Sequence, residues 1–491
     1  MTNTTFNNKS VIENNKNRVQ FLIFFVIFIY LIICAIQPVT TDFMHLYNSG
    51  KEIVETKNLI YYNNDFVLSG YKVVIQQWLY DIFLYLFAQI GYIGTVIFIF
   101  IQEVFLFYSY YKLCRELKCS EIESLVVCLF GLLMFYSYLN LRPQMITIIL
   151  LTWSIIFIER SNNTNNTKWL YLLPLLTWVE VNVHSTCVLF HIAILLPYMV
   201  PFIRKFNVKI KQSNLFIVTL LDIIFMFINP YGIKAITCVF ATYNDLTWVG
   251  ELRTHHILLY SLIFLMSIIG LYKFKCLTNV NLYLSMGMFI VFFKSYRNVM
   301  FLSLAMVYSY AMIFYNAKIE SMICLILNKL MYNVILVLCS ILLLINFCMS
   351  YDYFENNSNI VDSLMDVNIG CSKPAIDYIK QNEADFKDVK VLTDFDIGAY
   401  FIYNDIHKIY MQGKAEVYAK GVNEVENVLV EYRNIFFGRV EKEEFENFLN
   451  KYNFDYVCLE YDYSFIRYLQ ESEEWVLILN NDFCQLYKRI K

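Results

Sequence analysis

A few charged and polar side chains interrupt the apolar parts of this sequence, and their chemistry suits a reaction between a phosphate ester and a hydroxyl. Asp42 and His45 follow the first apolar run, and their spacing would place them on one face of a helix. A carboxylate there can take a proton from a hydroxyl, while the imidazole can bind phosphate or orient the carboxylate. The other interpretation of Asp42 is that it caps a helix beginning near Phe43.

Cations stand between apolar runs at two further places. Arg142 lies beside a proline between two runs, and Lys294 and Arg297 flank a Ser-Tyr pair. Guanidinium and ammonium groups can stabilise the charge that develops on a leaving phosphate. Arg142 could equally extend toward a membrane interface, where its charge would be hydrated. The pair of cations makes a better phosphate clamp than a single cation, which favours a phosphate-binding role.

Glu180 and His184 are four residues apart, with Asn182 between them. Their string, EVNVH, is close to a zinc motif but lacks the second histidine of HExxH. We therefore expect these groups to line an acceptor or phosphate cavity, the alternative being a hydrogen-bonded kink between two helices. A divalent metal at Asp42 and His45 would need more ligands than these two, so no cofactor is expected.

The elements that position these residues are mostly apolar helices. The chain has 491 residues, 58% hydrophobic and 16% charged, with a mean hydropathy of +0.47. A run of roughly 20 apolar residues crosses about 30 Å of hydrocarbon, and several runs before residue 350 have that character. We predict an α-helical polytopic membrane protein of about 11 spans, plus a re-entrant or interfacial helix, with a C-terminal soluble α/β domain.

The predicted domains are a cytoplasmic tail at 1–18, a transmembrane domain at 19–350 with its first outer loop at 39–91, and an extracytoplasmic domain at 351–491. The predicted spans are residues 19–38, 92–112, 122–139, 145–158, 170–183, 187–202, 215–228, 257–272, 282–293, 300–314 and 330–348. Residues 78–90 are apolar but contain Asp81, so we interpret them as the re-entrant or interfacial helix. In the C-terminal domain, residues 390–393 and 456–459 are predicted strands and 441–452 a helix.

Lysine and arginine set the predicted orientation. They are more frequent in alternate loops, which the positive-inside rule places in the cytoplasm together with the N-terminus. The C-terminal domain then lies outside a cell membrane, and the polar groups described above gather at the outer face. The first apolar run has no small-residue cleavage site and is interpreted as an uncleaved signal anchor. Charged groups at membrane depth are costly, which points to function.

Several function classes are disfavoured. The net charge of −3 and the lack of a basic cluster argue against nucleic acid. There is no nucleotide-binding glycine loop and no CxxC pair, and the 13 cysteines mostly lie in apolar runs, where they act as small hydrophobes. A transporter more often shows internal repeats, and the sequence shows none.

Short motifs occur in a characteristic order. They are Thr-Thr-Asp-Phe-Met-His at 40–45, Gly50, Gln-Trp-Leu at 77–79, Ile-Gly at 90–91, Leu-Arg-Pro-Gln at 141–144, Glu-Val-Asn-Val-His at 180–184, Asn-Pro-Tyr-Gly at 229–232, Asp-Phe-Asp-Ile-Gly-Ala-Tyr at 394–400 and Met-Gln-Gly-Lys-Ala-Glu-Val-Tyr at 411–418. This order resembles a family of bacterial multi-span proteins in the GT-C glycosyltransferase superfamily, related to the protein O-mannosyltransferases and the lipid A aminoarabinose transferase. Relatives often have Asp-Gly-Arg where this chain has Gln-Gly-Lys at 412–414.

The resemblance implies a membrane glycosyltransferase that moves a sugar, with inversion, from a polyprenyl-phosphate donor to an acceptor at the outer membrane face. GT-C enzymes generally place an acidic residue in the first outer loop, and Asp42 matches that place as the catalytic base. The residues expected to bind substrate or phosphate are His45, Arg142, Glu180, His184, Lys294 and Arg297. The expected partners are the lipid-linked donor and membrane lipid, with no nucleic acid and an unknown acceptor. The alternatives are a transporter or flippase for a lipid-linked saccharide, and a non-catalytic membrane assembly or sensor protein.

Overall fold

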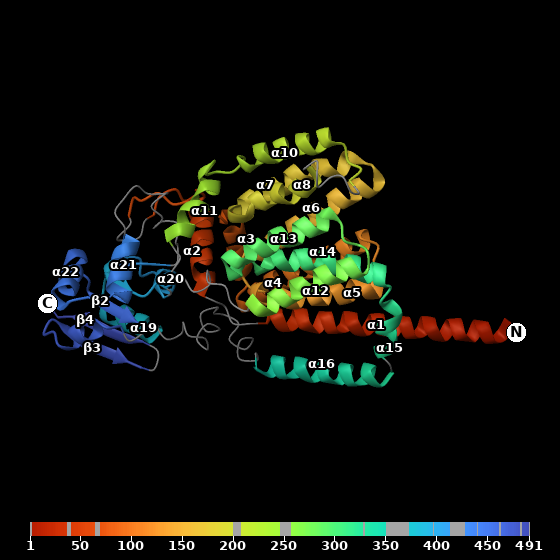
Figure 1. Ribbon diagram of the computed structural model, residues 1–491. Coiled ribbons are helices and arrows are strands. Elements are labelled where there is room, and N and C mark those ends of the chain that lie inside the picture. Colours follow the sequence, from red (N-terminus) through yellow and green to blue (C-terminus); the bar gives the residue numbers. More distant parts are fainter. Residues whose placement is uncertain are drawn as a thin grey trace. The chain divides into compact units, whose positions relative to one another are not determined.

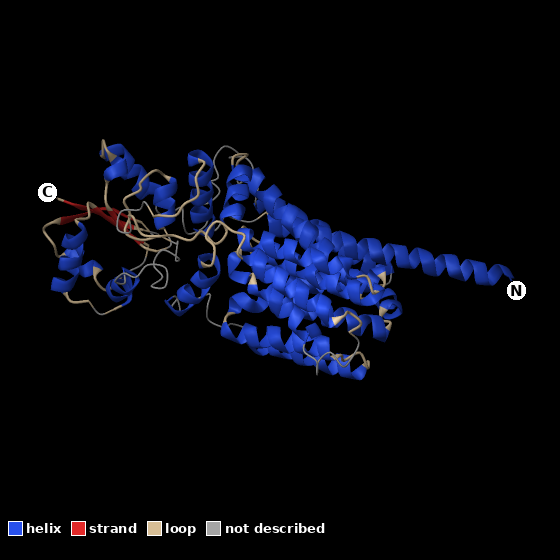
Figure 2. Cartoon of the chain, turned by 90° about the horizontal axis from the view of Figure 1, so that it is seen from above, coloured by secondary structure: helices blue, strands red, loops and turns tan. Residues whose placement is uncertain are grey.

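The structure is a computed structural model, mainly helical, with one small sheet in its C-terminal part (Figures 1 and 2). It describes residues 2–36, 41–63, 69–199, 208–245, 257–327, 329–349, 373–395, 397–412, 428–438, 440–460, 463–481 and 484–490. Contacts divide the chain into two units, which we describe separately. The helical unit comprises Met1–Gln37, Val96–Asn229 and Thr247–Tyr351, and the mixed unit comprises Pro38–Thr95, Pro230–Leu246 and Asp352–Lys491.

The helical unit is built mainly from apolar helices. The helices are α1 (Thr2–Ala35), α4 (Tyr92–Glu116), α5 (Glu121–Met134), α6 (Gln144–Thr164), α7 (Leu173–Val183), α8 (Leu189–Met199), α10 (Gln212–Met226), α12 (Ile257–Lys273), α13 (Asn279–Lys294), α14 (Val299–Ala317), α15 (Glu320–Ile326) and α16 (Lys329–Met349). The 3₁₀ turns are η1 (Tyr136–Tyr138), η2 (Thr167–Leu172), η3 (Ser185–Cys187) and η5 (Tyr296–Asn298).

Four helices in the described ranges are long and apolar enough to cross a membrane. They are Lys16–Ala35, Tyr92–Glu116, Gln144–Thr164 and Tyr296–Ala317. At a rise of 1.5 Å per residue, helices of this length reach about 30 Å or more, the thickness of the hydrocarbon layer. Further apolar helices are shorter, among them Ser185–Met199, Gln212–Met226 and Ile257–Lys273. These helices agree with a membrane protein, while the count of about 11 spans and the topology stay predictions.

The mixed unit combines helices from three parts of the chain with a four-stranded sheet. Its helices are α2 (Thr41–Thr56), α3 (Trp78–Ala88), α11 (Lys234–Asp245), α19 (Lys373–Asn382), α20 (Gly398–Tyr403), α21 (Val428–Phe437), α22 (Lys442–Tyr452) and α23 (Ile466–Gln470). The strands are β1 (Val391–Thr393), β2 (Tyr456–Leu459), β3 (Trp475–Asn480) and β4 (Gln485–Arg489), in the order β1-β2-β4-β3. β1 and β2 are parallel, and the other pairs are antiparallel. The two predicted strands and the predicted helix are confirmed, and the β3–β4 hairpin was not predicted.

Helix α2 is fixed within the mixed unit by close packing against α3. A Cβ added to Gly50 would lie 2.1 Å from the Asp81 carbonyl oxygen, so only glycine allows the two backbones to approach this closely. α2 also contacts α20, where Asn48 Nδ2 donates to the Ala399 carbonyl at 2.9 Å. With 11 residues, α3 is about 16 Å long, too short to cross the hydrocarbon layer, which fits the interfacial or re-entrant interpretation of residues 78–90.

Some motif positions lie outside the described residues. They are Pro38 and Thr40 near the first motif, Asp396 in the first tail motif, and residues 413–418 in the second. Within the described part, Asp394 Oδ2 accepts from the Glu460 backbone N–H at 2.6 Å and so ties β1 to the end of β2.

Candidate active site

The chain leaves its helical path at the EVNVH motif, as the sequence predicted. α7 ends at Val183, and His184 adopts φ −159° and ψ 74° before η3 and α8. The His184 backbone N–H still donates to the Glu180 carbonyl, at 2.7 Å. The break therefore keeps both side chains beside the end of α7, with Glu180 Oε1 and His184 Nδ1 4.0 Å apart.

A buried threonine hydroxyl links these two side chains. Thr147, in the first turn of α6, has its Oγ1 2.7 Å from Glu180 Oε1 and 2.7 Å from His184 Nδ1. On the other edge of the ring, Thr186 Oγ1 lies 2.6 Å from His184 Nε2. Glu180 is fully buried, and its second oxygen, Oε2, has no hydrogen-bond partner among the described residues. The imidazole is thus held on both nitrogens beside a carboxylate with one unused oxygen.

Arg297 belongs to the same cluster through its charge. Its guanidinium acts electrostatically on His184 and on Cys187. Arg297 is partly buried in η5, where its backbone N–H donates to Ser295 Oγ at 3.3 Å. Lys294, the last residue of α13, is exposed, and a cation is favoured there by the helix dipole. One cation, Arg297, therefore acts on the cluster, and a second, Lys294, lies three residues before it in the chain.

The loop before α6 meets the turn that carries Arg297. Ser137 Oγ and Tyr296 Oη lie 3.1 Å apart, and the rings of Tyr138 and Tyr296 are 6.5 Å apart. Arg142 is partly buried in the same loop, where its backbone N–H donates to the Asn140 carbonyl at 2.8 Å. Three loops of the helical unit, carrying Arg142, His184 and Arg297, thus lie near one another.

Asp42 and His45 lie in the mixed unit, on α2, and both are partly buried. Asp42 is in the first turn of the helix, where the helix dipole favours a negative charge, and His45 follows one turn later. The helix around them is held by rings, since Tyr47 lies 5.2 Å from Tyr85 and 5.0 Å from Tyr403. The predicted spacing on one helix face is therefore present.

Sequence reasoning missed Thr147 and Cys187. The threonine stands in an apolar run, and nothing in the sequence distinguishes it from Thr152, whose hydroxyl only donates to the Ile148 carbonyl at 2.6 Å. Cys187 was assigned to the apolar background with the other cysteines. Its position seven residues after Glu180, on the same face of a helical repeat, was the signal that could have identified it.

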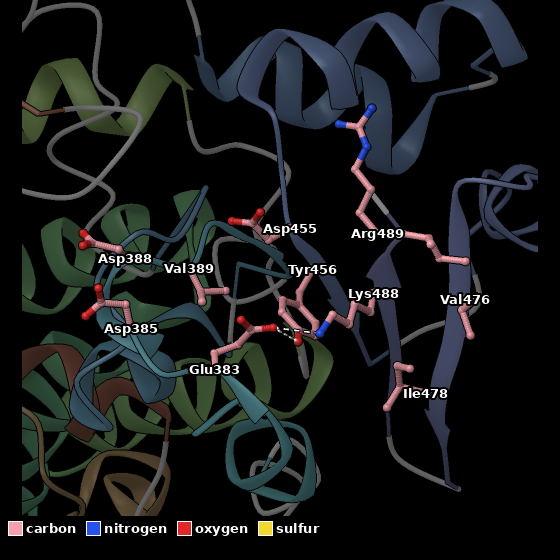
Figure 3. A pocket seen from close by; sticks show the side chains of 11 residues that line it. Glu383, Asp385, Asp388, Val389, Asp455, Tyr456, Val476, Ile478, Lys488 and Arg489 are labelled. Carbon is pink, nitrogen blue, oxygen red and sulfur yellow. Dashed lines mark hydrogen bonds and ion pairs between the residues drawn. The ribbon is translucent and has the colours of Figure 1, made fainter. Parts of the chain in front are cut away.

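The C-terminal sheet borders a cavity of about 630 Å³ in the mixed unit (Figure 3). Its lining carries both signs of charge, and most of these charges already have partners. Glu383 Oε1 accepts from Tyr456 at 2.6 Å and pairs with Lys488 at 2.9 Å, as the dashed lines in Figure 3 show. Asp388 pairs with Lys408 at 2.6 Å, and Asp455 accepts from the Lys390 backbone N–H at 3.0 Å. The charges on this face hold the sheet and its neighbours together.

Comparisons with known proteins identify the fold. No protein-family model matches the chain, and no curated protein matches its sequence. The crystal structure of the Archaeoglobus fulgidus oligosaccharyltransferase in the apo form matches with a TM-score of 0.55 and 12% identity, over 90% of this chain and 69% of that chain. The same enzyme tethered to an acceptor peptide with an NVT sequon gives a TM-score of 0.48 and 12% identity, over 89% of this chain and 69% of that one. The chain thus shares the fold of an archaeal oligosaccharyltransferase.

Proposed function

We propose that this protein is a membrane glycosyltransferase of the GT-C type, which moves a sugar from a polyprenyl-phosphate donor to an acceptor hydroxyl at the outer membrane face. The observation that carries the proposal is the fold, which matches the apo oligosaccharyltransferase over 90% of this chain. The motif order along the chain supports it independently, because the fold comparison rests on backbone shape. Neither observation identifies the sugar or the acceptor.

The reaction is a single displacement at the anomeric carbon. The acceptor oxygen forms a bond to that carbon, and the bond to the donor phosphate oxygen breaks, so that polyprenyl phosphate leaves with the electron pair. The acceptor proton must go to a base, and we assign that role to Asp42. A displacement in one step inverts the configuration of the sugar, as in inverting glycosidases.

The cations of the helical unit suit the leaving phosphate. Arg297 acts on the cluster around His184, and Arg142 lies on the loop that meets the Arg297 turn. A guanidinium can give a phosphate two parallel hydrogen bonds, which adds orientation to charge. We assign Arg142, Lys294 and Arg297 to the phosphate, with His184 as a neighbouring hydrogen-bonding group. His45, next to the assigned base, would orient Asp42 or bind the phosphate.

The test is a transfer assay with the purified full chain and a panel of radiolabelled polyprenyl-phosphate sugars. Free polyprenyl phosphate and labelled product are measured with lipid, peptide and polysaccharide fractions as acceptors. We expect transfer from at least one donor. Asp42→Asn should lower the rate by roughly 10²- to 10⁴-fold, the usual contribution of a general base. The rate of the native protein should fall at low pH, and any residual activity of the variant should lack that fall.

Glu52→Gln is the matched control, because Glu52 lies on the same helix and undergoes the same change of charge. It should keep the native rate. Asn also retains the volume of Asp42 and can still cap a helix, so both variants should unfold at nearly the same temperature as the native chain. Near-native transfer by Asp42→Asn would remove Asp42 from the mechanism. Transbilayer movement of the donor without any transfer would instead support the flippase alternative.

A further inference from the structure

The break between α7 and α8 brings a third metal-binding side chain to the pair that the sequence identified. Glu180, His184 and Cys187 each offer one ligand atom, and these atoms all lie within 4.8 Å of one another. All three side chains are buried. Residues spaced i, i+4 and i+7 would share one face of an unbroken helix. Here the chain leaves the helical path at His184, and η3 places Cys187 beside the other two side chains.

We infer that Glu180, His184 and Cys187 form a binding site for a divalent transition metal, with zinc as the best fit. Zinc accepts carboxylate, imidazole and thiolate ligands together, whereas magnesium and calcium require oxygen ligands. With bonds of about 2.0–2.3 Å, neighbouring ligands of tetrahedral zinc lie roughly 3.3–3.8 Å apart. Glu180 Oε1 and His184 Nδ1 are 4.0 Å apart, so small side-chain rotations would close the site.

Burial and charge favour an occupied site. Glu180 Oε2 is buried and has no hydrogen-bond partner in the described ranges, and a polar atom in that state is costly unless a ligand occupies it. A zinc ion with one carboxylate, one thiolate and a neutral imidazole carries no net charge, which is the arrangement that a buried place tolerates best. Binding releases the thiol proton of Cys187 to solvent.

The surrounding hydroxyls complete the site. Metal-bound histidines usually hydrogen-bond through their second nitrogen, which fixes the ring. Thr147 Oγ1 lies 2.7 Å from His184 Nδ1, and Thr186 Oγ1 lies 2.6 Å from His184 Nε2. Either nitrogen can therefore bind the metal while the other keeps its hydrogen bond to a threonine hydroxyl. Three protein ligands leave a fourth position open, as in catalytic zinc sites. Arg297, which acts on His184 and Cys187, would favour an anionic oxygen at that position.

The chain contains an internal control for this inference. Ser154 and His191 repeat, seven residues later, the pairing of Thr147 and His184, since Ser154 Oγ lies 3.0 Å from His191 Nδ1. No third ligand joins this second pair among the described residues. His191→Asn should therefore leave metal binding unchanged, while His184→Asn should abolish it.

The experiment measures metal on the full chain, purified without a histidine tag, stripped with a chelator and reloaded with Zn²⁺ or Co²⁺. We expect about one ion per chain by mass spectrometry, and a thiolate-to-cobalt charge-transfer band in the near ultraviolet. Glu180→Gln, His184→Asn and Cys187→Ser should each weaken Zn²⁺ binding by tenfold or more, a typical lower limit for losing a supporting group. Cys276→Ser, which removes another buried cysteine of the helical unit, should retain ion and band.

Two outcomes would overturn the inference. One is a native chain that retains no stoichiometric metal after reloading, and the other is equal metal content in the native chain and all three ligand variants. If a variant does not fold, the native chain alone still decides, because bound zinc should slow alkylation of Cys187 at least tenfold and leave Cys276 unaffected. Neither readout needs a donor or an acceptor, so this inference can fail or hold independently of the proposed transferase function.

Discussion

The hydroxyl of Thr147 sets the positions of two side chains that the sequence placed four residues apart. Without it, the buried carboxylate of Glu180 and the ring of His184 would have no common partner among the described residues. That the EVNVH residues line a cavity stays a prediction, while the structure places Arg297 close enough to act on His184. Position in the chain could not identify Thr147, because a threonine in an apolar run usually donates only to its own helix.

The proposed phosphate-binding role of Arg142 and Arg297 can be tested separately from the proposed role of Asp42 as the base. Arg142→Ala and Arg297→Ala should each weaken binding of a short-chain polyprenyl phosphate, measured by calorimetry. A charge-assisted hydrogen bond contributes about 1.5–3 kcal/mol, so the dissociation constant should rise roughly 10- to 150-fold. Arg142→Lys should rescue only part of the loss, since lysine lacks the planar pair of donors.

Lys273→Ala is the control for these variants, because Lys273 is an exposed cation in the last turn of α12. It should bind the lipid phosphate as the native chain does. If both arginine variants also bind normally, these cations only anchor the helices at a membrane interface.

A carboxylate in the C-terminal domain gives a prediction about pH. Glu431 accepts from Tyr452 at 2.5 Å and from Lys451 at 2.6 Å. Burial, and then the Glu431 carboxylate, raise the pKa of Tyr452 to about 12 from an ordinary 10. Because the folded pKa is the higher one, this stabilisation is complete below about pH 10 and is lost as the pH rises through about 12. Tyr452→Phe should therefore be less stable than the native chain at pH 8, and the difference should shrink toward pH 12.

The measurement compares urea unfolding of the two full chains in detergent at pH 8, 10 and 12. Tyr468→Phe serves as control, because its hydroxyl donates to the Val440 carbonyl and does not contact a carboxylate in the described structure. A difference between Tyr452→Phe and the native chain that stays constant over this pH range would show that the hydroxyl does not titrate as inferred.

At the scale of the elements, the close approach of the α2 and α3 backbones at Gly50 fixes the position of α2 within the mixed unit. Gly50→Ala places a Cβ 2.1 Å from the Asp81 carbonyl oxygen, so α2 and α3 must separate. Overpacking of this kind costs about 1–3 kcal/mol, and we expect a lower unfolding temperature and a lower transfer rate, since α2 carries Asp42. Gly287→Ala is the control, because its Cβ would meet nothing within 4 Å and alanine favours a helix by up to about 1 kcal/mol. Equal stability of the two variants would contradict the tight α2–α3 contact.

The elements also show how far the sequence could predict this fold. Apolar runs and the polar EVNVH string located the C-terminal end of α7 at Val183 and the start of α8 to within two residues, while the outer ends of both helices differ by three. The strands β1 and β2 were found because both are short, fully buried apolar runs. The β3–β4 hairpin was missed, since β3 is mostly exposed and its register shifts between Leu477 and Leu479, which breaks the two-residue alternation. Contacts made through tertiary packing, such as Thr147 with His184, leave no such pattern.

At the scale of the whole molecule, the similarity to a known enzyme lies in the fold and not in the sequence. An identity of 12% over 90% of the chain leaves the fold as the feature that this protein shares with the archaeal enzyme. For the proposed transferase, we expect specificity for the sugar and the acceptor to reside in the loops and in the mixed unit.

The orientation of the molecule in the membrane is the remaining prediction at this scale. Loops such as 112–118 and 273–275 are rich in lysine and arginine, and the positive-inside rule places them with the N-terminus in the cytoplasm. Lys209 should then be inside and Glu473 outside, and both are exposed, so a cysteine at either place would be reactive. None of the 11 cysteines whose burial the structure describes is exposed, which keeps background labelling low, and Cys348→Ser and Cys371→Ser remove the other two. In intact cells, an impermeant maleimide should label Glu473→Cys and spare Lys209→Cys, and both should react once the membrane is permeabilised.

Labelling of position 209 but not of position 473 in intact cells would reverse the topology, and would move the cations and the proposed base to the cytoplasmic face.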